Sequence, residues 1–319
     1  MGPTASGKTQ AALEISKIIP CEMISCDSMQ VYRGMPILTQ APAVKIRGQL
    51  KSHLVSFLNP SEEYSAARFR EDARRLIPGI LKRKKVPLVV GGTGLYLRAL
   101  LDGLFASAGP VFRDEAYRQK LNAAQEKHGG DFLHQKLEAV DPVSAKKIHP
   151  NDVRRLVRVL EIYHLSGKSF SEQKTNRSGV RGLYDVRIYL LDHDRRALYE
   201  RINGRVDAMI KEGLIGEVKR LLGKKMSMTA GMALGFREIS SYLAGKISLP
   251  EALEALKKNT RRYAKRQLSW FRHEKGVEAV PVGPKDTAMA IAREVMRRFT
   301  TSPLPNLPLR KGEGDKGHV

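Results

Sequence analysis

Residues 2–9 read Gly-Pro-Thr-Ala-Ser-Gly-Lys-Thr and match the phosphate-binding pattern G-x-x-x-x-G-K-[ST], the P-loop. Its glycines let backbone N–H groups wrap around phosphate oxygens, Lys8 adds a positive charge, and the Thr9 hydroxyl can hold Mg²⁺ or a further oxygen. A P-loop joins a strand to a helix, and a helical pattern follows here at 9–19. A chance glycine turn is the alternative, but the helix behind the motif favours a phosphate site.

The segment ahead of this loop is short, because only Met1 precedes Gly2. The first core strand normally leads into a P-loop. Either the start of the chain is truncated or another segment fills that position, and without the strand we expect a gap in the sheet.

Strands and helices alternate in the first hundred residues. Apolar strands are expected at 22–26 and 86–90, and helices at 66–84 and from residue 94 onward. Strands interleaved with helices imply a parallel sheet that is covered on both faces. The predicted fold class is therefore α/β, with a P-loop NTPase-like parallel sheet flanked by helices.

The middle of the chain, residues 107–180, is strongly charged and carries helical patterns without a convincing strand. Start and stop signals place its helices at 114–127, 132–140, 142–148 and 152–165. We interpret it as an all-helical insertion within a core made of 1–106 and 181–299. In that core a strand is expected at 185–191, with helices at 194–222 and 249–273. Residues 300–319 are rich in Pro, Gly and charge and are expected to be disordered.

The composition is strongly basic, with 56 Lys and Arg against 33 Asp and Glu, a formal net charge of +23. Such a surplus favours a polyanionic partner, with nucleic acid first, although a solvated basic surface is the alternative. No apolar run approaches the roughly 20 residues of a membrane span. The two cysteines, Cys21 and Cys26, form neither a disulfide framework nor a metal site. We therefore expect a cytoplasmic protein that does not bind membranes, and a monomer.

The acidic residue that a P-loop kinase or ATPase uses for Mg²⁺ is absent from its usual place. The strand at 86–90 ends in Gly91-Gly92-Thr93-Gly94, where such an acid would be expected. Asp27 instead follows the strand at 22–26, and the carboxyl ends of parallel strands are where ligands of α/β sheets bind. A carboxylate there can accept a proton from a nucleophile, and the alternative role is a helix N-cap. The glycines at 91–94 either allow a close approach to the backbone or make a tight turn.

Several longer segments together resemble the tRNA dimethylallyltransferases, also called tRNA isopentenyltransferases. The resemblance runs from Gly2 to about Phe271 and keeps the family's order and spacing. It is carried by these segments: GPTASGKT (2–9), CDSMQVYRGM (26–35), PLVVGGTGLYL (87–97), NDVRRLVRVLEIY (151–163), LYERINGRVDAMIKEGLIGEV (198–218), GFRE (235–238) and TRRYAKRQLSWF (260–271).

The resemblance implies transfer of a dimethylallyl group from dimethylallyl diphosphate, with Mg²⁺, to N6 of the adenosine 3′ of the tRNA anticodon. The implied catalytic residues are Asp27, as acceptor of the N6 proton, Thr9, which also holds Mg²⁺, and Arg205. The residues implied to bind the donor diphosphate are Gly2, Thr4, Ala5, Ser6, Gly7, Lys8 and Thr9. The acceptor base must leave the anticodon-loop stack to reach this site.

Basic residues on the helical patterns suit an RNA partner. Arg154 and Arg158 lie four residues apart beside an apolar stripe, as do Arg262 and Arg266 on the pattern at 249–273. A solvated basic helix is the alternative for both. The residues predicted to contact the tRNA anticodon stem-loop are Asp27, Ser28, Met29, Gln30, Thr93, Arg118, Arg154, Arg155, Arg158, Gly235, Phe236, Arg237, Arg262 and Arg266.

Two segments depart from the family pattern. Residues 36–42 read Pro-Ile-Leu-Thr-Gln-Ala-Pro and lack the usual Gly and Lys, and 51–54 read Lys-Ser-His-Leu where Pro-His-His-Leu is usual. Both are expected on loops near the acceptor site, where they would affect donor selectivity and RNA fit. Two further functions are open on the sequence: a P-loop kinase of a small molecule, and an RNA-binding protein that is inactive because its first strand is lost.

Overall fold

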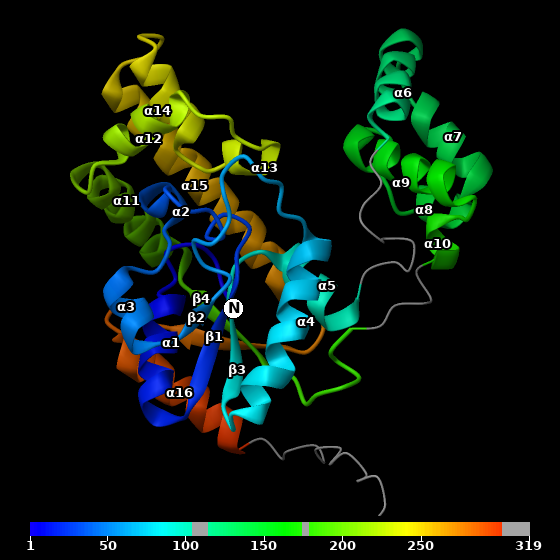
Figure 1. Ribbon diagram of the computed structural model, residues 1–319. Coiled ribbons are helices and arrows are strands. Elements are labelled where there is room, and N and C mark those ends of the chain that lie inside the picture. The colour runs from blue at the N-terminus through cyan, green and yellow to red at the C-terminus, as the bar shows by residue number, and fades with distance from the viewer. Residues whose placement is uncertain (104–113, 174–178, 302–319) are drawn as a thin grey trace, which may run out of the picture. The chain divides into compact units, whose positions relative to one another are not determined.

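The structure, a computed structural model, describes residues 1–103, 114–173 and 179–301 (Figure 1). The chain divides into two compact units, one made of Met1–Leu100 with Leu183–Val319 and the other of Leu101–Gly182. The second unit falls within a few residues of the predicted insertion at 107–180. The disordered tail predicted at 300–319 lies almost wholly outside the described residues, which end at 301.

The larger unit contains two parallel sheets. In the first, β1 (Cys21–Cys26) lies between β2 (Ser52–His53) and β3 (Val86–Gly91). The second pairs β4 (Ile188–His193) with β5 (Val277–Val282). All pairings are parallel, so the carboxyl ends of the strands in each sheet point the same way. The predicted α/β class with a helix-flanked parallel sheet is confirmed.

Met1 and Gly2 connect these two sheets. The amine of Met1 donates to the Tyr189 carbonyl at 2.6 Å, and the Met1 carbonyl accepts from the Leu191 N–H at 3.0 Å. On the other side, the Gly2 N–H donates to the Gly91 carbonyl at 3.3 Å. Met1 is therefore bonded to β4, and the first residue of the P-loop is bonded to the carboxyl end of β3.

Helices cover the first sheet on both sides. Helix α1 (Lys8–Ile18) and helix α4 (Ala66–Lys82) both contact β1 and β3, and Figure 1 shows them on opposite sides of these strands. Helix α16 (Ala288–Thr301) packs on α1 and completes an apolar core with Ile15, Met23 and Val280. Neither β5 nor α16 was predicted from the sequence.

Two long helices border the carboxyl ends of the strands. Helix α11 (Arg195–Lys211) contacts α15 (Leu249–Arg272), whose start is fixed by a reciprocal capping box between Ser248 and Glu251. The single helix predicted at 194–222 is wrong, because Gly213 adopts φ 99° and separates α11 from α12. The remaining helices of this unit are α2 (Pro36–Thr39), α3 (Val44–Gln49), α5 (Gly94–Asp102, which runs into the second unit), α12 (Leu214–Leu222), α13 (Met228–Gly231) and α14 (Phe236–Leu243).

The smaller unit is helical throughout its described residues. Its helices are α6 (Glu115–His128), α7 (Phe132–Val140), α8 (Pro142–Ala145), α9 (Val153–Ser166) and α10 (Phe170–Gln173). Leucines from α6, α7 and α9 form its apolar core. Within the described ranges of the whole chain, no helix has the length and apolar character needed to cross a bilayer.

A fully buried carboxylate ties two helices of the smaller unit together. Glu161 of α9 accepts two hydrogen bonds from Arg118 of α6, both at 2.7 Å, and one from Arg158 at 2.5 Å. Burial alone would raise the pKa of Glu161, but these guanidinium hydrogen bonds hold it below its usual value. Its charge is therefore stabilised only in the folded unit.

We predict that Glu161→Ala destabilises this unit by about 3 kcal/mol, because two partly buried guanidinium groups lose their partner. A carboxyl with a depressed folded pKa contributes stability above its unfolded pKa of about 4.3, and loses that contribution as the pH falls through the lower folded pKa. Urea unfolding between pH 3 and 7 measures both effects. Glu161→Gln should remove this part of the acid dependence, and an unchanged pH profile in that variant would contradict the assignment.

Candidate active site

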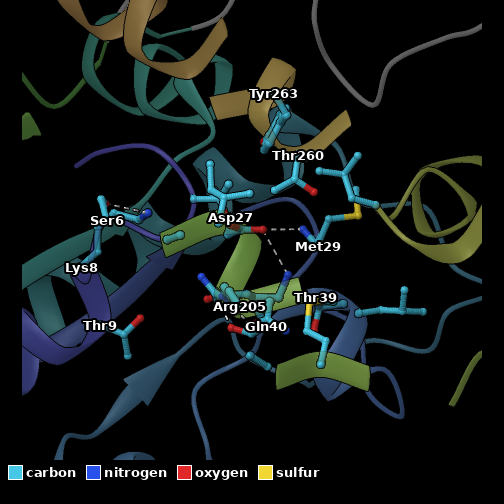
Figure 2. A pocket seen from close by; sticks show the side chains of 18 of the residues that line it. Ser6, Lys8, Thr9, Asp27, Met29, Thr39, Gln40, Arg205, Thr260 and Tyr263 are labelled. Carbon is cyan, nitrogen blue, oxygen red and sulfur yellow. Dashed lines mark hydrogen bonds between the residues drawn. The ribbon is translucent and has the colours of Figure 1, made fainter. Parts of the chain in front are cut away.

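A cavity of about 860 Å³ lies at the P-loop (Figure 2). It is lined by the P-loop, the turn after β1, the segment at 36–43, and helices α11 and α15, all from the larger unit. The carboxyl ends of β1 and β3 supply the turns beside it, as expected for a ligand site in an α/β fold.

The P-loop backbone is held in place by side chains that bind its carbonyl groups. Lys8 Nζ donates to the Pro3 carbonyl at 2.5 Å, and Arg201 Nε donates to the Ala5 carbonyl at 3.0 Å. His193 Nε2 lies 2.9 Å from the Ser6 carbonyl, so this nitrogen carries the ring proton. Burial lowers the pKa of His193, which keeps the ring neutral. With three carbonyls occupied in this way, the loop keeps a fixed shape.

Lys8 is the cation at the centre of this loop. Burial, with a smaller effect of nearby Arg205, lowers the pKa of Lys8 to about 8, and the charge of Asp27 opposes that shift. None of the described carboxylates lies within ion-pair distance of Lys8; its ammonium instead bonds the Pro3 carbonyl of its own loop. An anion that takes the place of the Pro3 carbonyl next to this ammonium would raise the pKa of Lys8 back toward its ordinary value.

Gln267 of α15 joins the P-loop to the turn after β3. Its buried side chain accepts from the Thr4 N–H at 2.8 Å and donates to the Gly92 carbonyl at 2.9 Å. A Cβ on Gly92 would fall 2.2 Å from Gln267 Nε2, one on Gly91 2.0 Å from the Cys26 carbonyl oxygen, and one on Gly94 2.3 Å from the Trp270 ring. The missing side chains of these three glycines therefore make room for other residues of the protein.

Asp27 directly follows β1 and lines the cavity. Its Oδ1 accepts from the backbone N–H groups of Met29 at 2.8 Å and Gln30 at 3.3 Å, which fixes the turn in the way that an N-cap does. Among the described residues, Oδ2 has no hydrogen-bond partner. The neighbouring Ser28 N–H donates to Thr93 Oγ1 at 3.1 Å, so the turn after β3 supports the turn after β1. One carboxylate oxygen of Asp27 therefore anchors the turn, and the other is available to a ligand.

Arg205 of α11 lies in the same cavity wall, below Asp27 in Figure 2. Burial lowers the pKa of Arg205, and the charges of Asp27 and Glu212 oppose that effect. Its Nε donates to Gln40 Oε1, a neutral amide. In the described ranges no carboxylate comes within ion-pair distance of this guanidinium, so its charge is not cancelled by a direct partner.

Apolar side chains line the rest of the cavity and could receive an alkyl group. They come from the segment at 36–43, α3, α11, α15 and the link before α14: Leu38, Ile46, Ile202, Val206, Met209, Met232, Leu234 and Leu256. A cavity lined by both cations and apolar side chains suits an amphipathic anion.

The residues predicted to bind RNA are distributed over both units. Ser28, Met29, Gln30 and Arg266 line the cavity together with Asp27. Thr93, Gly235, Phe236, Arg237 and Arg262 lie in the larger unit but outside the cavity lining.

Four more of the predicted arginines belong to the smaller unit. Arg118 and Arg158 bind Glu161, and Arg155 lies 3.5 Å from Asp152. Arg154 is exposed. RNA contact by these residues stays a prediction.

The two segments that depart from the family pattern have different locations. Residues 36 and 38–42 line the cavity, as expected, but 36–39 form helix α2 instead of the expected loop. The expected location of 51–54 near the site is wrong, because His53 on the edge strand β2 binds Glu22 at 2.8 Å, near the amino end of β1. Gln40, Thr260, Tyr263 and Gln267 also line the cavity but were not predicted as site residues. For Gln40 and Gln267 the reason is that their hydrogen bonds to Arg205, Thr4 and Gly92 join segments distant in sequence.

The chain is similar to known proteins over most of its length. A family model described as IPP transferase matches residues 30–274. The chain is 47% identical to a tRNA dimethylallyltransferase of Carboxydothermus hydrogenoformans (86% of this chain and 88% of the relative) and 45% identical to one of Geobacillus kaustophilus (87% and 88%).

Solved structures are similar over nearly the whole chain. The tRNA isopentenylpyrophosphate transferase of Bacillus halodurans matches with a TM-score of 0.65 and 38% identity, covering 93% of this chain and 94% of that one. A eukaryotic dimethylallyltransferase acting on tRNA matches with a TM-score of 0.75 and 29% identity, covering 93% and 76%.

The lowered pKa of Lys8 predicts that inorganic pyrophosphate binds more weakly as the pH rises through about 8. Binding favours the ammonium form, so affinity is highest below this pKa and falls roughly tenfold between pH 7 and 9. Isothermal titration calorimetry in two buffers should also show proton uptake near pH 8.

The matched control is Lys8→Arg, because arginine keeps its charge over this range. Relative to that variant, the wild-type protein should lose affinity as the pH rises. Parallel pH profiles of the two proteins would show that Lys8 is not the group that titrates.

Proposed function

This chain belongs to the IPP transferase family and is an enzyme of the tRNA dimethylallyltransferase class, and we propose that its P-loop holds the diphosphate of dimethylallyl diphosphate while Asp27 receives the proton of the acceptor amine. The acceptor is N6 of the adenosine on the 3′ side of the anticodon in the tRNA anticodon stem-loop. The cavity next to the P-loop supplies both an anion site and an apolar wall for these groups.

The observation that carries the proposal is a pair of cations without direct counter-charges in one cavity. Lys8 and Arg205 both line it, and among the described residues neither has a carboxylate within ion-pair distance. Two such cations are costly to bury and suit a multiply charged anion. The diphosphate of the donor has this charge, and the apolar wall formed by residues such as Val206 suits its five-carbon chain.

The proposed roles of these residues follow from where charge develops during the reaction. The N6 lone pair attacks C1 of the dimethylallyl group, the C1–O bond breaks, and the diphosphate leaves with the bonding electrons. Negative charge grows on the leaving diphosphate, where P-loop N–H groups, Lys8 and Arg205 stabilise it. The N6 proton passes to a carboxylate, and Oδ2 of Asp27 is the oxygen that is free for this role.

The Thr9 hydroxyl is the protein group proposed to hold Mg²⁺. Thr9 lines the cavity and presents a hard oxygen atom, which suits Mg²⁺. Mg²⁺ usually keeps several waters and binds through one or two protein oxygens plus substrate phosphates, so this sparse donor set fits. When bound, it supplies charge neutralisation for the diphosphate.

The acceptor base is proposed to enter beside Asp27. Ser28, Met29 and Gln30 form the turn there, with Arg266 on the neighbouring wall, and all four line the cavity. An adenine that is turned out of the anticodon loop could place its N6 next to Asp27.

Replacing Asp27 with asparagine tests the acceptor half of the proposal. Asparagine cannot accept the N6 proton as a carboxylate does but keeps an oxygen for the Met29 and Gln30 N–H groups, so the turn is preserved. We predict a loss of turnover of at least about 10²-fold, the usual scale for a general base, with unchanged affinity for an anticodon stem-loop RNA.

Single-turnover assays with dimethylallyl diphosphate and fluorescence anisotropy with the RNA measure the two quantities. The exposed Asp286, whose carboxylate accepts from the Gly283 N–H, provides the control variant Asp286→Asn. Full turnover in Asp27→Asn would remove Asp27 from the mechanism. Loss of RNA binding along with turnover would assign it an RNA-contacting role instead.

A further inference from the structure

Gln40 stands in an unusual backbone conformation next to the proposed diphosphate site. It follows α2 with φ 54° and ψ 39°, in the left-handed region that residues other than glycine seldom adopt. Its backbone N–H donates back into the α2 turn, and its carbonyl accepts from Gln30 Nε2 at 3.1 Å. The residue is therefore fixed by contacts to two separate turns.

The α2 turn that carries Gln40 is itself anchored to the core. Glu217 of α12, which is 1% exposed, accepts from the backbone N–H groups of Ile37 at 3.1 Å and Leu38 at 2.7 Å. Thr39 Oγ1 donates to the Met35 carbonyl at 2.7 Å. A buried carboxylate at the start of this short helix makes α2 a firm support.

Both polar atoms of the Gln40 side chain make hydrogen bonds, which fix its orientation. Nε2 donates to the Ile37 carbonyl at 2.5 Å, which directs Oε1 to the Nε of Arg205 (Figure 2). Arg205 has five N–H donors, and this contact occupies only the one on Nε. Among the described residues, its two terminal nitrogens have no hydrogen-bond partner, so they are available for a bidentate contact.

The Gln40 side chain is uncharged, and this determines its effect on the charge of Arg205. A glutamate at position 40 would orient Arg205 equally well but would cancel its charge, whereas an apolar residue would preserve the charge without orienting the group. The Gln40 amide both orients Arg205 and preserves its charge.

We propose that Gln40 is a positioning residue that holds Arg205 toward the diphosphate of the donor while leaving its charge intact. The inference rests on the proposed function, because it takes Arg205 as a diphosphate ligand. It adds a residue from the segment at 36–42, in which this chain differs from the family pattern. Through Gln30, Gln40 also connects Arg205 to the turn that carries Asp27.

The test compares two variants of this residue by titration with inorganic pyrophosphate. Gln40→Met keeps the side-chain length and removes the hydrogen bond, so we expect binding to weaken about fivefold, on the scale of one hydrogen bond to a charged group. Gln40→Glu should weaken it further, to about 30-fold or more, because the carboxylate neutralises Arg205 and repels the ligand. Gln49→Met, at an exposed position at the end of α3, is the matched control.

A double-mutant cycle separates positioning from a general structural role. In an Arg205→Ala background, Gln40→Met should have no further effect on pyrophosphate affinity, because the group it orients is gone. Affinity for the anticodon stem-loop RNA and the thermal midpoint should stay near the wild-type values for Gln40→Met.

These measurements test the role of Gln40 separately from the role of Arg205 as a diphosphate ligand. If Arg205→Ala leaves pyrophosphate affinity unchanged, the assignment of Arg205 to the diphosphate is wrong. If Arg205→Ala weakens binding but Gln40→Met does not, or if Gln40→Met weakens it equally in both backgrounds, Gln40 is not a positioning residue for Arg205.

Discussion

The hydrogen bonds that hold the P-loop backbone are the constraint on which the site depends. Met1 and Gly2 bond to β4 and β3, and side chains from α11, α15 and β4 bind the loop itself. Gln267 is the most informative of these, because one buried amide fixes both Thr4 and Gly92. Helices far along the chain are thus part of the phosphate site.

The electrostatics of the cavity follow from that framework. The fixed loop carries Lys8, and α11 carries Arg205, at positions where burial lowers the pKa of both groups. Such cations reduce the stability of the free protein, because they are partly desolvated without a direct counter-ion. Their placement is explained by a ligand that carries the missing negative charge. No acid follows β3, where a P-loop kinase would place one; Gly91 and Gly92 pack there against Cys26 and Gln267.

Local signals in the sequence were enough to predict part of this architecture. The P-loop and the position of Asp27 at a strand end depend on neighbours in the chain, and the structure places them in one cavity. The contacts of Gln267, Arg201 and Gln40 join residues 263, 196 and 165 positions apart, so no short pattern indicates them. Strand β5 was missed because its exposed residues interrupt the apolar run, and Glu161 because its partner Arg118 lies on another helix.

The central claim is that one cavity holds both the diphosphate of a prenyl donor and the adenine that receives the prenyl group. The most direct measurement is mass analysis of nucleosides from tRNA incubated with the protein, Mg²⁺ and dimethylallyl diphosphate. The account predicts a mass increase of one isoprene unit on a single adenosine, next to the anticodon, with release of one pyrophosphate per modified tRNA. Unmodified tRNA under conditions in which both ligands bind, or modification at other nucleosides, would contradict it.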